Sequence, residues 1–355
     1  MFKIQSLRFK VQSSMIQQFN HLIPKSSNHL IFKSSHHLIL KSSHHLIPFF
    51  LLLSAFCLLL SACQTEIDVK VPDYYNKIVV EGYIENGEYP IVSLYRSVPY
   101  FSEMSLDYLL KSVIISDARV YVTSSKGETQ ELFMAADPQA PLFFAYKGRG
   151  FKGEFNTSYT LRIELDGKTY TSETSILNSF DLDSVYFAPT FGKTEIDSVA
   201  NLRIKMKDNG QADNYYQFKV KIHCKEFADR LWVTTIPAAF DNSPFRGQEF
   251  NYEIIRGAPS ILLKEMSDQE RRHYFRGNYR VGDTVYMKYA RLDESAFRFW
   301  LSANGELTFG QNPFMAPEPI ISNIKCNTGE KCLGVWCGSA AKEIMMVLDT
   351  CHTRY

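Results

Sequence analysis

Histidine is scarce in the part of the chain that follows residue 62. The sequence contains nine histidines, and only His223, His273 and His352 lie beyond that point. Hydrolytic triads need a histidine base, and zinc centres need histidines or closely spaced cysteine pairs. The sequence therefore argues against a histidine-dependent hydrolase and a histidine-rich metal centre. We expect no catalytic residue, no metal ligand and no cofactor.

An excess of positive charge is also missing. The whole chain has a formal net charge of +1, but residues 1–62 hold six of its basic side chains and no acidic one. The remaining residues have 33 basic against 38 acidic side chains, a net charge of −5. Nucleic-acid-binding proteins present a basic face to phosphates, so we expect no nucleic-acid partner. Roughly 290 residues suffice for one large or two medium domains.

One long apolar run, Leu46–Ala62, ends directly before Cys63. Basic residues upstream of such a run and small residues at its end are typical of a secretory signal. The last four residues, Leu60-Ser61-Ala62-Cys63, resemble the lipobox of bacterial lipoproteins, whose cysteine is diacylated and becomes the new N-terminus. We therefore predict lipidation at Cys63. Cys57 fits less well because the bulky Phe56 precedes it.

Other interpretations of this run are weaker. A buried core helix is disfavoured because the run is apolar on all faces and has no polar stripe. A retained transmembrane helix stays an alternative, although about 17 residues is the short limit for spanning a bilayer. Under the lipoprotein interpretation, the protein is held at the outer membrane, and the membrane is a partner through the lipid anchor at Cys63.

Residues 1–45 precede this signal and contain an eight-residue repeat that begins at His21, His29 and His37. Histidine-rich tracts can bind metal, but this tract lies upstream of the predicted cleavage site. We interpret it as a low-complexity leader that the mature protein lacks. Residues 63–76 form a polar tether. Its acidic residues resemble a signal that sends lipoproteins to the cell surface, and a plain solvated linker is the alternative. The sequence thus leaves the face of the outer membrane open.

From residue 77 onward the hydrophobic pattern has a period of two. Residues 78–84 and 91–95 flank Asn86-Gly87, a strong hairpin signal. Residues 159–165 alternate apolar with polar side chains, as expected for a strand with one buried face. Further strands are expected at 119–123 and 168–172. Short alternating strands separated by turns predict a β-sandwich domain over residues 77–178 that needs no helix.

A second β-rich domain is predicted over residues 179–355, with strands at 202–206, 216–222 and 286–289. The Asp208-Asn209-Gly210 turn lacks the alternating oxygen ligands of a calcium loop. A short amphipathic helix is expected over 293–304, between an Asp293 cap and a stop at Asn304-Gly305. The predicted fold class is therefore mainly β, with two β-sandwich-like domains and one short helix near the C-terminus.

The C-terminal stretch carries a family resemblance. Gln311–Pro317, Ser322–Ile324 and Leu333–Gly338 resemble the tail of the domain-of-unknown-function family 4249. Members of this family are lipoproteins, often encoded beside TonB-dependent outer-membrane importers. The resemblance therefore implies a TonB-dependent importer and its lipoprotein as partners. It supplies no catalytic residues.

Cys326 and Cys332 depart from the family pattern and are spaced as C-x5-C. In an oxidising envelope compartment this spacing favours a disulfide-closed hairpin, worth roughly 2 kcal/mol in the chain-entropy model. Zinc would need C-x2-C-like pairs, so a metal site is the lesser alternative. Cys224, Cys337 and Cys351 leave at least one thiol free or in an intermolecular bond.

Residues 312–338 combine apolar side chains, including Phe314 and Trp336, with prolines that stop helix extension. Such a chain must shelter these side chains against another surface. That surface is either the protein's own sandwich or a partner, because exposed aromatic anchors dominate interfaces. The function we expect is a non-enzymatic accessory lipoprotein that captures ligand or docks on a TonB-dependent importer. A cell-surface hydrolase and a structural envelope protein are the alternatives.

Overall fold

The chain folds into a mainly β structure, described here from a computed structural model. The structure describes residues 77–98, 105–196, 198–225, 228–257, 276–309 and 319–349. The predicted leader, the apolar run, the tether with Cys63, and Phe314 lie outside these ranges. Within the described ranges, no helix has the length and apolar character needed to cross a membrane.

The described strands pair into one continuous 17-stranded sheet. Its strands are β1 (Ile78–Glu85), β2 (Ile91–Arg96), β3 (Arg119–Ser124), β4 (Thr129–Ala136), β5 (Phe144–Lys147), β6 (Thr157–Leu165), β7 (Lys168–Ile176), β8 (Ser184–Pro189), β9 (Val199–Lys207), β10 (Tyr215–His223), β11 (Val233–Ile236), β12 (Phe240–Asp241), β13 (Glu249–Arg256), β14 (Tyr279–Arg280), β15 (Thr284–Leu292), β16 (Lys325–Cys326) and β17 (Leu333–Val347). The helices are α3 (Leu106–Tyr108), continued by the π-helical turn η1 (Leu109–Val113), the 3-10 turn η2 (Ser243–Phe245), and α5 (Glu294–Phe309).

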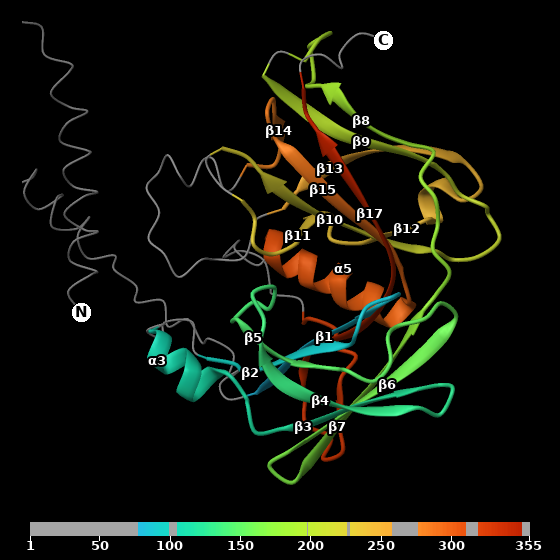
Figure 1. Cartoon of the computed structure of the whole chain (residues 1–355). Helices are drawn as coiled ribbons and strands as arrows, with labels where there is room; N and C mark the ends of the chain where they lie inside the picture. Colours follow the sequence, from blue (N-terminus) through green and yellow to red (C-terminus); the bar gives the residue numbers. More distant parts are fainter. Residues whose placement is uncertain are drawn as a thin grey trace, which may run out of the picture. The chain divides into compact units, whose positions relative to one another are not determined.

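One long layer of this sheet joins the two halves of the described chain. Its strand order is β4-β5-β2-β1-β17-β15-β10-β11, with β12 also paired to β10. β4 leads into a second layer, β3-β6-β7-β16. β13 links β11 to a third layer of β8, β9, β13 and β14. Figure 1 shows β17, in red, extending from beside β15 down to β1.

β17 is the junction within the long layer. Residues 333–339 pair in parallel with β1, and residues 339–347 pair antiparallel with β15, so only Ser339 has a partner in both strands. Gly334 has a φ of +111°, and a Cβ there would lie 1.8 Å from the carbonyl oxygen of Val80. β17 can therefore approach β1 this closely only because residue 334 has no side chain.

The two main cores lie on the same face of β17, because strand side chains alternate. Trp336 and Ala340 belong to the first core, which β1–β7 mainly supply. Ile344 and Met346 pack against the second core, built around β9, β10 and β15. On the opposite face, α5 packs against a smaller cluster that includes Cys337. Farther along that opposite face, Glu343 is followed by the exposed apolar side chains of Met345 and Val347.

The mainly β fold class is confirmed, while several predicted details are wrong. α5 continues through Asn304-Gly305 to Phe309, because one glycine inside a helix costs only about 1 kcal/mol. α3 and η1 form in the half where no helix was expected. Residues 333–338, the end of the 312–338 segment that was expected to lie over another surface, instead begin the central strand β17 (Leu333–Val347).

The first core also draws side chains from the far end of the chain. Ile324, Cys332 and Trp336 belong to it, although each lies well beyond residue 178. β16 likewise pairs with β7. Residues 72–355 accordingly form one compact unit, in which the two halves share the C-terminal strand.

Candidate functional site

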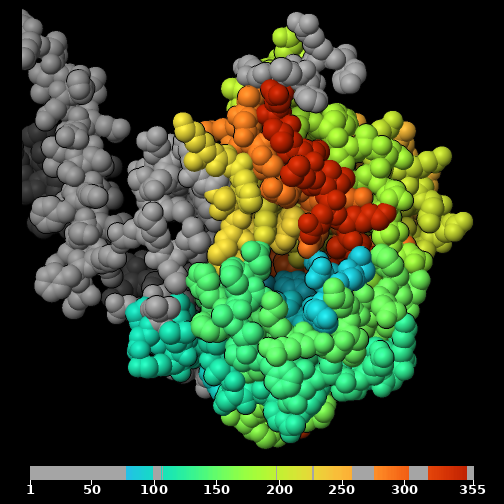
Figure 2. All heavy atoms as spheres, in the orientation of Figure 1, coloured from blue at the N-terminus to red at the C-terminus, as the bar shows by residue number. Residues whose placement is uncertain are grey.

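The surface is hollowed near the point where β1 ends. In Figure 2, blue atoms of β1 lie deep in this hollow, between green atoms of the first half and yellow atoms of the second. Near this point in the fold, contacts and strand pairing bring together a cluster of charged and aromatic side chains. We call this cluster the central recess and define it by Glu85, Lys219, Lys221, Trp232 and Lys288. Glu85 ends β1, the lysines come from β10 and β15, and Trp232 directly precedes β11. These side chains occupy the face of the long layer opposite the two cores.

Three lysines share this face because of the strand register. Lys219 and Lys221 are two positions apart on β10, and Lys219 lies directly opposite Lys288 of β15. Lys288 Nζ is 2.7 Å from a Glu85 carboxylate oxygen and 3.0 Å from one of Glu343. Like charges placed opposite each other destabilise a sheet. The two carboxylates offset this repulsion at Lys288, whereas neither β10 lysine forms an ion pair with another described residue.

Aromatic rings hold all three ammonium groups. The contacts to ring centroids are Lys219 Nζ with Tyr83 at 4.7 Å and Trp300 at 5.4 Å, and Lys221 Nζ and Lys288 Nζ with Trp232 at 4.9 Å each. Each such contact stabilises a cation by about 0.5–2 kcal/mol. Rings position an ammonium group without neutralising it. The ammonium groups therefore keep their positive charge.

Burial changes the protonation equilibria of these lysines. It lowers the pKa of Lys219, an effect that the nearby Glu85 carboxylate partly opposes. Burial also lowers the pKa of Lys221, and the Lys288 charge adds to that effect. Burial alone would lower the pKa of Lys288 as well, but Glu85 and Glu343 raise it overall. The lowered pKa values of the β10 lysines come first from desolvation of their ammonium groups, an effect that a bound anion would oppose.

A carboxyl group and a phenol, those of Glu81 and Tyr83, lie on the same face of β1 as Glu85. Tyr83 Oη donates a hydrogen bond of 2.9 Å to a Glu81 carboxylate oxygen. Burial raises the pKa of Glu81, opposed by that hydrogen bond and by the Lys219 charge. Burial also raises the pKa of Tyr83, together with the Glu81 charge. Glu81 therefore already has a hydrogen-bond donor and is a third carboxylate that acts on Lys219.

The loop between β4 and β5 forms one wall of the central recess. Arg230 lies beside this loop, with its guanidinium 4.3 Å from the centroid of the Phe143 ring. Arg230 donates three hydrogen bonds to carbonyl oxygens, those of Pro138 at 2.6 Å, Ala140 at 2.7 Å and Pro141 at 3.0 Å. Lys221 Nζ donates to Gln139 Oε1 at 2.6 Å. Residues from both halves therefore fix the wall.

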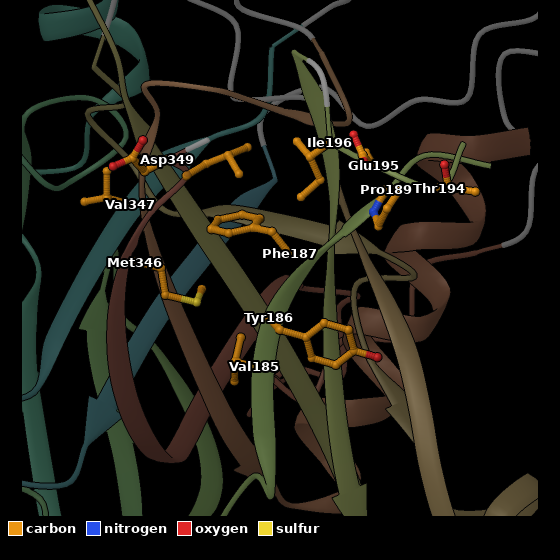
Figure 3. A pocket seen from close by; sticks show the side chains of 11 residues that line it. Val185, Tyr186, Phe187, Pro189, Thr194, Glu195, Ile196, Met346, Val347 and Asp349 are labelled. Atoms are coloured by element: carbon orange, nitrogen blue, oxygen red, sulfur yellow. The ribbon is translucent and has the colours of Figure 1, made fainter. Parts of the chain in front are cut away.

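A second hollow, shown in Figure 3, has a volume of about 620 Å³ and lies between β8 and the end of β17. Phe187 and Met346 point toward each other across it, while Tyr186 points away. Val185, Phe187 and Met346 also pack against the second core. This hollow is therefore an open end of that core, with Glu195 and Asp349 at its border. The central recess gathers far more charge, so we take it as the candidate functional site.

The predicted site residues that the structure describes, Trp336, Cys326 and Cys332, are not part of the central recess. Trp336 has no exposed surface and lies in the first core, where its indole Nε1 donates to the Tyr159 carbonyl oxygen at 3.0 Å. A side chain in that position locks the protein's own core and offers no ring to a partner. Cys63 and Phe314 lie outside the described residues.

Cys326 and Cys332 are both free thiols in the structure. Burial raises the pKa of Cys332 to about 11, and the neighbouring Cys326 adds to the effect. The two side chains are thus neighbours at the end of the first core. Their predicted disulfide stays a prediction. Among the described residues, no group of three or more histidine, cysteine or acidic side chains has the geometry to hold a metal ion.

Comparison with protein families identifies the chain. The family model described as "Domain of unknown function (DUF4249)" matches residues 64–344. The chain belongs to this family. No curated protein matches it. The match begins directly after Cys63 and runs almost to the end of β17, so it includes every residue of the central recess.

The sequence did not reveal the central recess. Lys219 and Lys221 alternate with buried apolar residues on β10, a pattern that is typical of an ordinary solvated strand face. What distinguishes them is the residue opposite, Lys288, and the Glu85 carboxylate from a strand 203 positions away. Only the register of β10, β15, β17 and β1 brings these groups together.

Proposed function

We propose that this DUF4249 protein is a non-enzymatic, lipid-anchored binding protein of the outer membrane. In this proposal the central recess captures a solute, and the protein serves as an accessory to a TonB-dependent importer. The observation that carries the binding role is the cluster of three lysines and three aromatic rings, in which Lys219 forms no ion pair with another described residue. Binding sites typically combine such concave, ring-lined surfaces with a few fixed polar groups.

The proposed anchor, a lipid on Cys63, lies a short distance before the first strand. Fourteen residues, 64–77, separate Cys63 from the first strand. An extended chain of that length reaches at most about 50 Å. A β unit on such a tether stays beside the membrane that holds its lipid, within reach of an integral membrane partner. Two acyl chains are enough for stable anchoring.

Metabolic labelling with a palmitate analogue tests the anchor. The wild-type chain and the Cys57→Ala control should both be labelled and recovered with outer membranes. Cys63→Ala should accumulate as an unlabelled precursor. Labelling of Cys63→Ala at the wild-type level would refute the lipoprotein proposal.

The importer partnership has its own measurement. Mild cross-linking of cells that express the tagged protein, followed by purification from outer membranes, should recover a TonB-dependent importer. Recovery should be lost for Cys63→Ala, because that variant is not anchored. Wild-type protein that reaches the outer membrane and yields no importer would refute this part of the proposal.

A further inference from the structure

Three lysines and three carboxylates meet around the central recess, but they pair unevenly. Glu85 and Glu343 both bind Lys288, and Tyr83 donates to Glu81. Lys221 donates to the neutral Gln139. Within the described chain, Lys219 contacts two rings and makes no hydrogen bond or ion pair that would neutralise it. The three carboxylates are therefore committed, and two lysines are not.

The spacing of these lysines suits a small anionic group. Residues two apart on one strand face the same side and are separated by about 6.5–7 Å along the strand. Two flexible ammonium groups at that spacing can converge on the oxygens of one carboxylate or phosphate. Charge-assisted hydrogen bonds of this kind are about twice as strong as neutral ones. The rings of Trp232 and Trp300 contact the same ammonium groups and border the space that the rest of the solute would occupy.

We propose that the central recess selects anionic solutes, and that Lys219 and Lys221 bind the carboxylate or phosphate group. This inference rests on the proposed binding function and names its ligand class. A cationic solute would have to compete with Lys288 and Tyr83 for carboxylates that already bind them. A neutral solute would leave the two ammonium groups without an acceptor, a cost that an anion removes.

Tryptophan fluorescence offers a direct test, because the chain has three tryptophans. Trp232 and Trp300 contact the recess lysines, while Trp336 is fully buried and serves as the unquenched fraction. The mature chain is titrated with iodide and, separately, with caesium at constant ionic strength. Each quenching constant is divided by its value for free N-acetyltryptophanamide, because iodide quenches indole more efficiently than caesium does. A recess whose lysines are available to anions concentrates iodide and excludes caesium, so the normalised iodide constant should exceed the normalised caesium constant by roughly threefold or more.

The variants make this test specific. Lys219→Met and Lys221→Met each keep the length and apolar stem of the side chain and should bring the two constants closer together. Lys207→Met, on an exposed position of β9, is the matched control and should leave their ratio unchanged. Melting curves confirm that all variants are folded. An unchanged ratio in both Lys219→Met and Lys221→Met would overturn the assignment of these residues.

The remaining outcomes separate this inference from the proposed function. Preferential quenching by caesium would refute an anionic ligand and leave a binding recess in place. Equal quenching by both ions would refute the charge selectivity in the same way. Absence of quenching by either ion and by neutral acrylamide would show a closed recess, and would overturn the binding function together with the ligand class.

Discussion

Replacing Trp336 with alanine tests how the C-terminal strand holds the first half together. The Trp336 side chain has no exposed surface, and its loss would leave a cavity in the first core. Large aromatic-to-alanine changes in cores cost about 3–5 kcal/mol. The Tyr159 carbonyl oxygen would also lose its indole donor, which can cost roughly a further 1 kcal/mol. We expect a net loss of about 4 kcal/mol, a large share of the stability of a typical protein.

Thermal unfolding followed by circular dichroism measures this loss. A penalty of that size corresponds to a fall in melting temperature of about 10 °C for a unit of this length. Trp232→Ala is the matched control, because its ring is only half-buried and should cost less than about 2 kcal/mol. A loss below about 1 kcal/mol in Trp336→Ala, with reduced recovery of a partner, would refute the core assignment and favour an interface role.

A substitution at Gly82, which lies against the Trp336 ring, is a second test of this packing. A Cβ added at Gly82 would lie 2.7 Å from Trp336 Cε3, whereas its next neighbour, Val92 Cγ2, is at an ordinary 3.4 Å. Gly82→Ala alone should therefore destabilise by about 1–3 kcal/mol through overpacking. In the Trp336→Ala background the clash disappears, so the same change should cost almost nothing. Additive penalties in the double variant would show that the two residues do not pack as described.

Two further predictions concern acid stability and the cysteines. Burial alone would raise the pKa of Asp208, but hydrogen bonds led by the Gly247 N–H and Asn242 hold it at about 2. Because the folded pKa is depressed, Asp208 should contribute about 2 kcal/mol that is complete above pH 4 and lost as the pH falls toward 2. Urea unfolding from pH 5 to pH 2 should show this loss, and its presence in Asp208→Asn would contradict it. Peptide mapping without reduction should find Cys326 and Cys332 on one cross-linked fragment in protein from the envelope. Free thiols at both positions would contradict the pairing.

The parts of the fold that could be predicted are those with local signals. Asn86-Gly87 sits at the turn between β1 and β2, where Gly87 has a φ of +77°. Asp166-Gly167 likewise separates β6 from β7, and the buried side chains of β6 alternate as expected. Asp293 caps α5, since its Oδ1 accepts a hydrogen bond from the Ala296 N–H. Each of these features depends on residues within a few positions of one another.

β17 could not be predicted because its sequence lacks a strand-like alternation. Seven consecutive residues, 334–340, are buried, and several of them are small. Gly334 is required by the approach of Val80. Ser339 has partners on both sides, Glu85 in β1 and Leu292 in β15. This part of β17 is buried on both faces, so neither face is polar. Its sequence therefore shows no alternation with a period of two.

The position of the central recess follows from the same strand. β17 pairs with β1 only up to Ser339 and with β15 only from Ser339 onward. The two neighbours are therefore offset: β1 ends at Glu85, where β15 continues beside β17 and β10 lies beside β15. That offset brings the last side chain of β1 within 2.7 Å of Lys288. It leaves Lys219 and Lys221 facing the space beyond the end of β1. A shift of β17 by two residues against β15 would keep every apolar side chain on its proper face and still separate Glu85 from Lys288. The alternation of faces alone thus permits more than one register, and the Glu85–Lys288 ion pair is one of the contacts specific to the observed one.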